Sequence, residues 1–279
     1  IAALDELEIL PPADDAEHSH ERLIYCFGDG YADGSGRMVE ELGGKGAGLA
    51  EMTNLGIPVP AGFTIACSAC MEYLATGGVP RALRQEVSEH LTRLEQTTGR
   101  RLGDTKHPLL VSVRSGAAVS MPGMMETVLN LGLNDETVEA LAAQSGNPRF
   151  AWDAYRRFLQ MYGDVVLNVP SAQFEALLST KRMLAKVEVD SDLSESALRA
   201  LTAEYKALVR NVTKMDFPMD PGQQMWGAIE AVWRSWTLKK AVDYRKVNSI
   251  ADDLGTGVNI VAMVFGNMGE ESGSGVGVR

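Results

Sequence analysis

Apolar residues in the first part of the chain form short runs separated by helical spacings. Residues 23–27 and 62–66 are apolar runs of strand length. Between them, a glycine-rich turn leads into a segment in which Leu49, Met52 and Leu55 recur every three residues. This spacing predicts a helix with these side chains on one face.

A second helix and a further strand are predicted next. Pro80 suits the first turn of a helix, and apolar residues recur at helical spacing after it. Residues 109–113 form a continuous apolar run, which Arg114 ends. The helix after Pro80 carries Leu83, Val87, Leu91 and Leu94 on one face.

The pattern becomes almost entirely helical after residue 133. Asn134 and Asn147 are capping residues before helical stretches, and Asp220 caps a later helix. Residues 257–265 are again an apolar strand. Other helices are predicted over residues 173–186 and 194–209, and the last one has the stripe Met225, Ile229, Val232 and Trp236.

The change from a mixed pattern to a helical one and back predicts one α/β unit with a helical insertion. A chain of 279 residues is long enough for such a unit. The expected parts are an acidic, flexible lead-in at residues 1–21 and a nucleotide-binding α/β part at 22–133. An inserted helical subdomain at 134–218 and a return to the α/β part at 219–279 complete the chain.

Composition narrows the function classes. The formal net charge of −11, with 37 acidic and 26 basic residues, argues against nonspecific binding of nucleic acid. No apolar run approaches the roughly 20 residues of a membrane span, and the start does not resemble a signal peptide. Three cysteines suit a reducing cytoplasm. Cys67 and Cys70 form a C-x-x-C, but without matching histidines we favour small residues near a helix start over a metal or redox pair.

Two segments could contact phosphate. Closely spaced glycines in residues 42–49 let backbone amides approach phosphate oxygens, and Lys45 adds a positive charge. The segment is not a Walker A loop, and a plain strand-to-helix turn is an equal alternative. Arg114, at a strand end, could present its guanidinium to phosphate or pair with a carboxylate.

Three further segments are less specific. The methionines of residues 120–127 are either core filler, which we favour, or an adaptable contact surface. Arg156 and Arg157 are adjacent in a helix, so one of them must lie near its apolar side. Residues 270–277, rich in Gly and Ser, could form a flap over polyphosphate or a flexible terminus.

Together these segments resemble the pyruvate, phosphate dikinase family. The methionine-rich stretch separates this family from the similar phosphoenolpyruvate synthases (water dikinases), which lack it. The matching stretches are residues 42–53, 56–64, 111–117, 120–135, 155–162 and 263–269.

The resemblance implies an ATP-grasp-like domain with an inserted helical subdomain and an incomplete C-terminal lobe. It also implies roles for particular residues, with residues 261–265 beside the adenine. The implied ATP contacts are Lys45, Arg114, Gly123, Ser274 and Gly275, and the implied catalytic residues are Arg114 and Arg157.

The family converts ATP, pyruvate and phosphate to AMP, phosphoenolpyruvate and diphosphate through a phosphohistidine on another domain. The resemblance therefore implies ATP and Mg²⁺ as cofactors and a homo-oligomeric whole protein. The carrier histidine, the metal ligands and the pyruvate-binding barrel are expected beyond Arg279, with no metal ligand within this chain. We therefore expect this chain alone to be inactive. Alternatives are a water dikinase, a nonenzymatic nucleotide-binding fragment or a structural module that binds nothing.

Overall fold

The computed structural model of the protein describes residues 22–275. The predicted lead-in, residues 1–21, and the end of the predicted flap, residues 276–279, lie outside this part.

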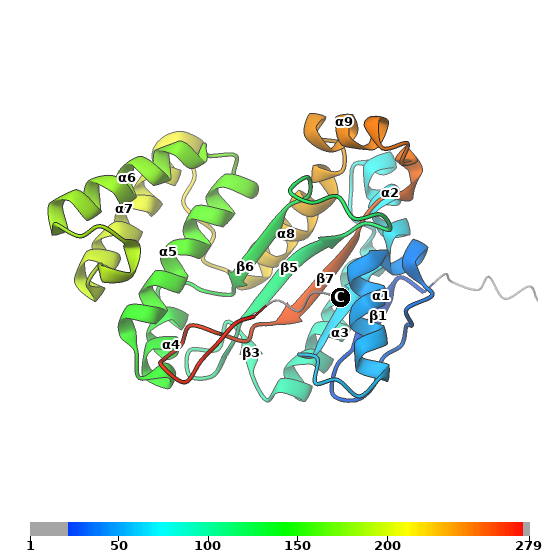
Figure 1. The fold of residues 1–279 in the computed structure, drawn as a ribbon, viewed down its shortest axis with the longest axis horizontal. Coiled ribbons are helices and arrows are strands. Elements are labelled where there is room, and N and C mark those ends of the chain that lie inside the picture. The colour runs from blue at the N-terminus through cyan, green and yellow to red at the C-terminus, as the bar shows by residue number, and fades with distance from the viewer. Residues whose placement is uncertain (1–21, 276–279) are drawn as a thin grey trace, which may run out of the picture.

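A five-stranded antiparallel sheet forms the centre of the molecule (Figure 1). The strand order is β1-β2-β7-β5-β6, so the last strand in the chain pairs with two strands from its first half. The predicted mixture of helices and strands is confirmed. The strands are β1 (Ile24–Phe27), β2 (Gly62–Ile65), β5 (Val111–Gly116), β6 (Thr127–Leu131) and β7 (Gly257–Ala262), and β3 (Arg101–Leu102) pairs with β4 (Pro108–Leu109) in a small parallel sheet.

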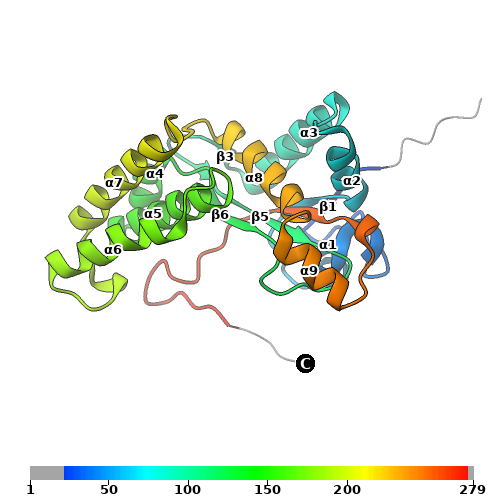
Figure 2. The ribbon, with the colours of Figure 1, turned by 90° about the horizontal axis from the view of Figure 1, so that it is seen from above.

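Helices cover both faces of the main sheet (Figure 2). The helix α1 (Val39–Asn54) lies on one face against β7 and β5. On the other face, α3 (Arg81–Thr98) contacts β1 and β2, and α8 (Pro221–Ser235) contacts β5, β6 and β7. The remaining helices of this part are α2 (Cys67–Thr76) and α9 (Lys239–Val247). Cys67 and Cys70 lie in the first turn of α2, as expected for small residues near a helix start.

Four helices lie beside the β6 edge of the sheet (Figures 1 and 2). Among them, α5 contacts β6, α4, α6 and α7. In the described part of the chain, no helix is long and apolar enough to cross a membrane. The four helices are α4 (Thr137–Ser145), α5 (Pro148–Val165), α6 (Ser171–Ala185) and α7 (Glu195–Thr213).

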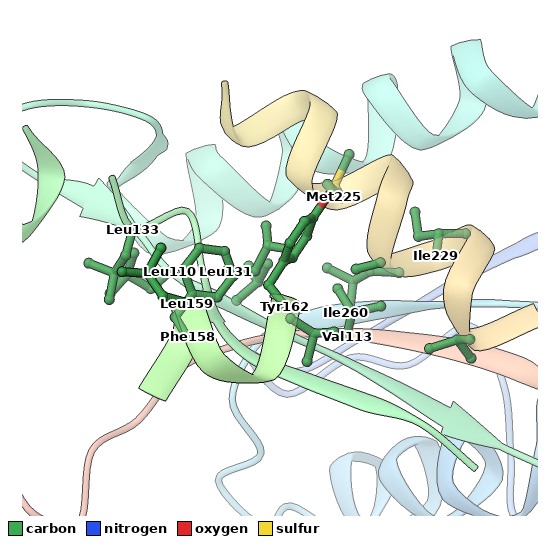
Figure 3. Packing of buried hydrophobic residues seen from close by; sticks show 14 of the residues in the cluster. Leu110, Val113, Leu131, Leu133, Phe158, Leu159, Tyr162, Met225, Ile229 and Ile260 are labelled. Atoms are coloured by element: carbon green, nitrogen blue, oxygen red, sulfur yellow. The ribbon is translucent and has the colours of Figure 1, made fainter. Parts of the chain in front are cut away.

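The apolar stripe of α8 packs on the sheet. Figure 3 shows Met225 and Ile229 facing Val113 of β5 and Ile260 of β7. All four residues are buried, and each buried aliphatic side chain contributes about 1.5–3 kcal/mol to stability. The predicted stripe, which also includes Val232 and Trp236, is confirmed as a buried surface.

The predicted face of the first helix is wrong. Leu55 is 69% exposed and Met52 is also exposed, whereas Leu42 and Ala50 are buried. The helix α1 begins at Val39 and is kinked at Gly43, so the glycine-rich segment forms a break within the helix rather than a turn before it. The glycines allow close approach to the sheet, and the small residues near them therefore form the buried face. The strand β6 and the helix α9 were not predicted.

Candidate functional site

Gly43 permits α1 to lie directly against β5. Its backbone has φ 69° and ψ 163°, which interrupts the helical geometry of α1. A Cβ atom at this position would lie 1.5 Å from the carbonyl oxygen of Gly116. The next residue, Gly44, donates a backbone hydrogen bond of 2.9 Å to the Ala117 carbonyl. Glycine is therefore required here by both conformation and space.

A buried amide joins the strands beneath α1. Thr64 of β2 donates a hydrogen bond of 2.8 Å from Oγ1 to Oδ1 of Asn259 on β7. The Asn259 Nδ2 donates to the Arg114 carbonyl of β5 at 3.5 Å. A Cβ atom on Gly46 would lie about 3 Å from both the Thr64 and Asn259 side chains. This packing sets the distance between α1 and the strands. It also holds the β5 backbone from which Arg114 projects.

Lys45 and Arg114 form a pair of cations on this face. The Lys45 Nζ donates a hydrogen bond of 2.8 Å to the Ser115 carbonyl. Burial lowers the pKa of Lys45, and the positive charge of Arg114 lowers it further. Arg114 is the exposed residue of an otherwise buried strand, and within residues 22–275 its side chain has no ion-pair or hydrogen-bond partner. Pairing with a carboxylate, the alternative for Arg114, does not occur in this part of the chain.

Both cations line a cleft of about 550 Å³ between α1 and the sheet. The two cations line this cleft together with the polar residues Ser112 and Asn259. Apolar residues make up the rest of the lining, which suits a ligand with an anionic end and a flat apolar body. The apolar lining residues are Leu49, Met52, Pro60, Val261, Ala262, Met263 and Val264.

Arg157 and Ser274 line a second cavity, of about 650 Å³. Met263 and Val264 line both cavities, so the two adjoin at this segment. The structure therefore places Lys45 and Arg114 at one cavity and Arg157 and Ser274 at the other, with residues 263–264 bordering both. Asn130 also lines the second cavity. It is only 8% exposed, and its Oδ1 has no hydrogen-bond partner in the described structure.

The two adjacent arginines of α5 share one carboxylate. Arg156 is buried and bonds to Asp153 Oδ1 through Nε at 2.9 Å and through an Nη atom at 2.8 Å. Arg157 is half-exposed and donates from Nε to Asp153 Oδ2 at 3.0 Å. The prediction that one of the two lies near the apolar side is confirmed, and that residue is Arg156. Arg157 keeps its guanidinium at the second cavity.

Replacing Arg157 by alanine should leave the free energy of unfolding within about 1 kcal/mol, because partly exposed ion pairs contribute little. Arg156→Ala removes a buried partner of Asp153 and should lower the free energy of unfolding by about 2 kcal/mol or more. Urea denaturation of both variants measures the difference. An equal or larger loss for Arg157→Ala would show that Arg157 has a structural role.

Gly123 and Gly275 line neither cavity. Gly123 is exposed in the turn between β5 and β6, with φ 73°, and a Cβ atom added to it would meet no atom within 4 Å. Of the neighbouring methionines, Met121 is buried and Met124 is partly buried against the core, as predicted for core filler. Gly275 is exposed at the end of the described chain.

Carboxylates are missing from the first cleft. No Asp or Glu lines it, and residues 22–275 contain no group of three His, Cys, Asp or Glu side chains that could hold a metal ion. Since Mg²⁺ prefers oxygen ligands, mainly carboxylates, the residues around Lys45 and Arg114 do not form a Mg²⁺ site.

Asn259 and Ser112 were not predicted as site residues. Asn259 could have been noticed as a polar residue inside the apolar run of residues 257–265. Ser112 gives the same signal inside the apolar run of residues 109–113. Their place in the cleft depends on the pairing of β5 with β7, which lie far apart in the sequence.

Comparisons with known proteins identify the family of the chain. The chain matches the family model "Pyruvate phosphate dikinase, AMP/ATP-binding domain" over residues 39–96 and 79–278. It is 52% identical to pyruvate, phosphate dikinase of Rhizobium meliloti over 256 residues, which cover 91% of this chain and 28% of the relative. The corresponding protein of Clostridium symbiosum is 48% identical over 257 residues, covering 91% and 29%. The chloroplastic pyruvate, phosphate dikinase 1 of Arabidopsis thaliana is 48% identical over 267 residues, covering 95% and 28%.

The chain thus spans less than a third of the length of these relatives. The family model covers nearly all of the described residues, including α1, the main sheet and the helices beside it. The chain belongs to the family of pyruvate phosphate dikinase AMP/ATP-binding domains.

Proposed function

We propose that this chain binds ATP as the nucleotide-binding part of a pyruvate, phosphate dikinase. The whole protein would convert ATP, pyruvate and phosphate to AMP, phosphoenolpyruvate and diphosphate, by way of a phosphohistidine outside residues 22–275. The observation that carries the proposal is the cleft in which Lys45 and Arg114 lie together, with Arg114 free of any carboxylate in the described chain.

Within this cleft, Lys45 and Arg114 would bind the phosphates of ATP. Two cations on a rigid strand and a packed helix neutralise charge without reorganising, which is the main contribution that a protein makes to phosphoryl transfer. The adenine would lie against the apolar wall formed by residues 261–264. Ser115 orients Lys45 through its carbonyl oxygen, because the hydrogen bond holds Nζ at the base of the cleft.

Arg157 and Ser274 would act from the adjoining cavity on the transferred phosphoryl group. The adjoining position supports this role, because a polyphosphate anchored at Arg114 could extend past Met263 and Val264. Gly123 and Gly275 would contribute backbone amides from loops that close over the ATP. The helices α4–α7 would form an inserted subdomain within an ATP-grasp-like fold, with Arg157 on its inner helix.

We propose Mg²⁺, phosphate and pyruvate as ligands of the whole protein. The ligands of Mg²⁺ would come from outside the described residues, since the first cleft has no carboxylate and residues 22–275 contain no group of three His, Cys, Asp or Glu side chains that could hold a metal ion. A homo-oligomeric assembly is likewise proposed for the whole protein. A cytoplasmic location stays a prediction, because the relatives include a chloroplastic protein.

ATP should raise the melting temperature of the chain by several degrees when its concentration greatly exceeds the dissociation constant. Lys45→Met, which removes the charge and keeps most of the length, should lose most of this shift. Differential scanning fluorimetry with increasing ATP measures both. An unchanged melting temperature at millimolar ATP would contradict the proposal, and so would an unchanged shift in Lys45→Met.

Chemistry needs a separate assay. A full-length protein that carries this chain should release AMP from ATP only when pyruvate and phosphate are present. ATP binding without any AMP release would instead identify a nonenzymatic nucleotide-binding protein.

A further inference from the structure

A thiol and an imidazole meet outside the nucleotide cleft. Cys26 lies on β1 and His90 on α3, and their Sγ and Nδ1 atoms are 2.9 Å apart. Both side chains line a small cavity of about 160 Å³, together with Arg93 and Tyr31. This volume admits a molecule the size of a few waters. No role in nucleotide binding accounts for the pair.

The surroundings of the pair favour its uncharged form. Asp33 accepts a hydrogen bond from the Cys26 amide at 2.7 Å and is neutralised by Arg22 at 2.5 Å. Burial raises the pKa of Cys26, and Arg93 opposes this rise. Burial also lowers the pKa of His90. Near neutral pH the pair is therefore a thiol and a neutral imidazole. In the tautomer that leaves Nδ1 unprotonated, the imidazole lies 2.9 Å from the sulfur and is placed to take the thiol proton as the sulfur reacts.

The other two cysteines lack this arrangement. Burial raises the pKa of Cys67 to about 11 and that of Cys70 to about 12. Cys70 is fully buried in α2. Cys67 is 3% exposed and borders another cavity, but Glu40 and Glu41 line that cavity and no histidine does. Of the three, only the Cys26 thiol combines an adjacent base with access to a cavity.

We propose that Cys26 is a modification site, at which a small hydroperoxide in the Cys26–His90 cavity oxidises the thiol to a sulfenic acid. The Cys26 sulfur attacks one peroxide oxygen, an S–O bond forms and the O–O bond breaks. His90 takes the thiol proton and passes it to the departing oxygen. With hydrogen peroxide, Cys–SH and H₂O₂ give Cys–SOH and H₂O, so sulfur loses the two electrons that the peroxide gains.

The test treats the reduced chain with hydrogen peroxide, traps sulfenic acid with dimedone and maps the adducts by mass spectrometry. Cys26 should acquire the adduct at least about tenfold faster than Cys67 or Cys70. His90→Gln removes the base and should slow adduct formation at Cys26 about tenfold, without changing the other two cysteines. Equal rates at all three cysteines would overturn the proposal, as would an unchanged Cys26 rate in His90→Gln.

Two further variants keep the test decisive. In Cys26→Ser, the dimedone adduct at residue 26 must be absent. The melting curve of this variant checks that it is folded. If His90→Gln does not fold, Arg93→Gln serves instead, since Arg93 is exposed on α3. Removing its positive charge should slow the reaction of Cys26 at least about threefold. An unchanged rate in folded Arg93→Gln would contradict a reaction in this cavity.

Discussion

Replacing Arg114 by alanine is expected to weaken ATP binding at least about tenfold, because a charged hydrogen bond contributes about 1.5–3 kcal/mol. Arg114 projects from β5 into the cleft and lacks an ion-pair partner within residues 22–275. Its removal should therefore affect ligand binding much more than folding. Isothermal titration of ATP into the variant measures the affinity, and urea denaturation measures the stability.

Arg100→Ala is the matched control for this variant. Arg100 is also an exposed arginine whose side chain has no hydrogen-bond or ion-pair partner within residues 22–275, and it lines neither cavity. Its replacement should leave ATP affinity within about twofold, as for a distant surface charge. The phosphate role of Arg114 is wrong if both variants bind ATP as tightly as the original chain.

Gly43→Ala should lower the free energy of unfolding by about 3 kcal/mol or more, because it combines overpacking with a strained backbone. The added Cβ would lie 1.5 Å from the Gly116 carbonyl oxygen, and φ at this position is 69°. α1 would have to move away from β5, and Lys45 would move with it. Urea denaturation measures the loss, and ATP titration should show weakened binding in whatever protein remains folded.

Gly48→Ala is the control variant in the same helix, at a position where an added Cβ fits. A Cβ at Gly48 meets no atom within 4 Å, and its φ is not positive. Because alanine favours helix over glycine, this variant should gain up to about 1 kcal/mol. If Gly43→Ala were as stable as Gly48→Ala, the close packing of α1 on β5 would be refuted.

Many of the elements could be predicted from the local sequence. The stripe of α8 and the caps at Asn147 and Asp220 depend on neighbouring residues, and the structure has both caps accepting hydrogen bonds from backbone amides three residues on. The face of α1 could not be predicted in this way. Apolar spacing favoured Leu49, Met52 and Leu55, yet the buried face follows the small residues that fit against the sheet.

The sequence by itself determined the family, the class of fold and the choice of Lys45 and Arg114, the two cations that line the first cleft, because all three depend on short local stretches. Only the tertiary structure decided which of these residues act together. β7 pairs with β2 and β5 across long sequence separations, and this pairing brings Asn259 beneath α1. It also places residues 263–264 between the cavity of Arg114 and the cavity of Arg157. Contacts between distant segments depend on how whole elements pack, and no local spacing along the chain records that.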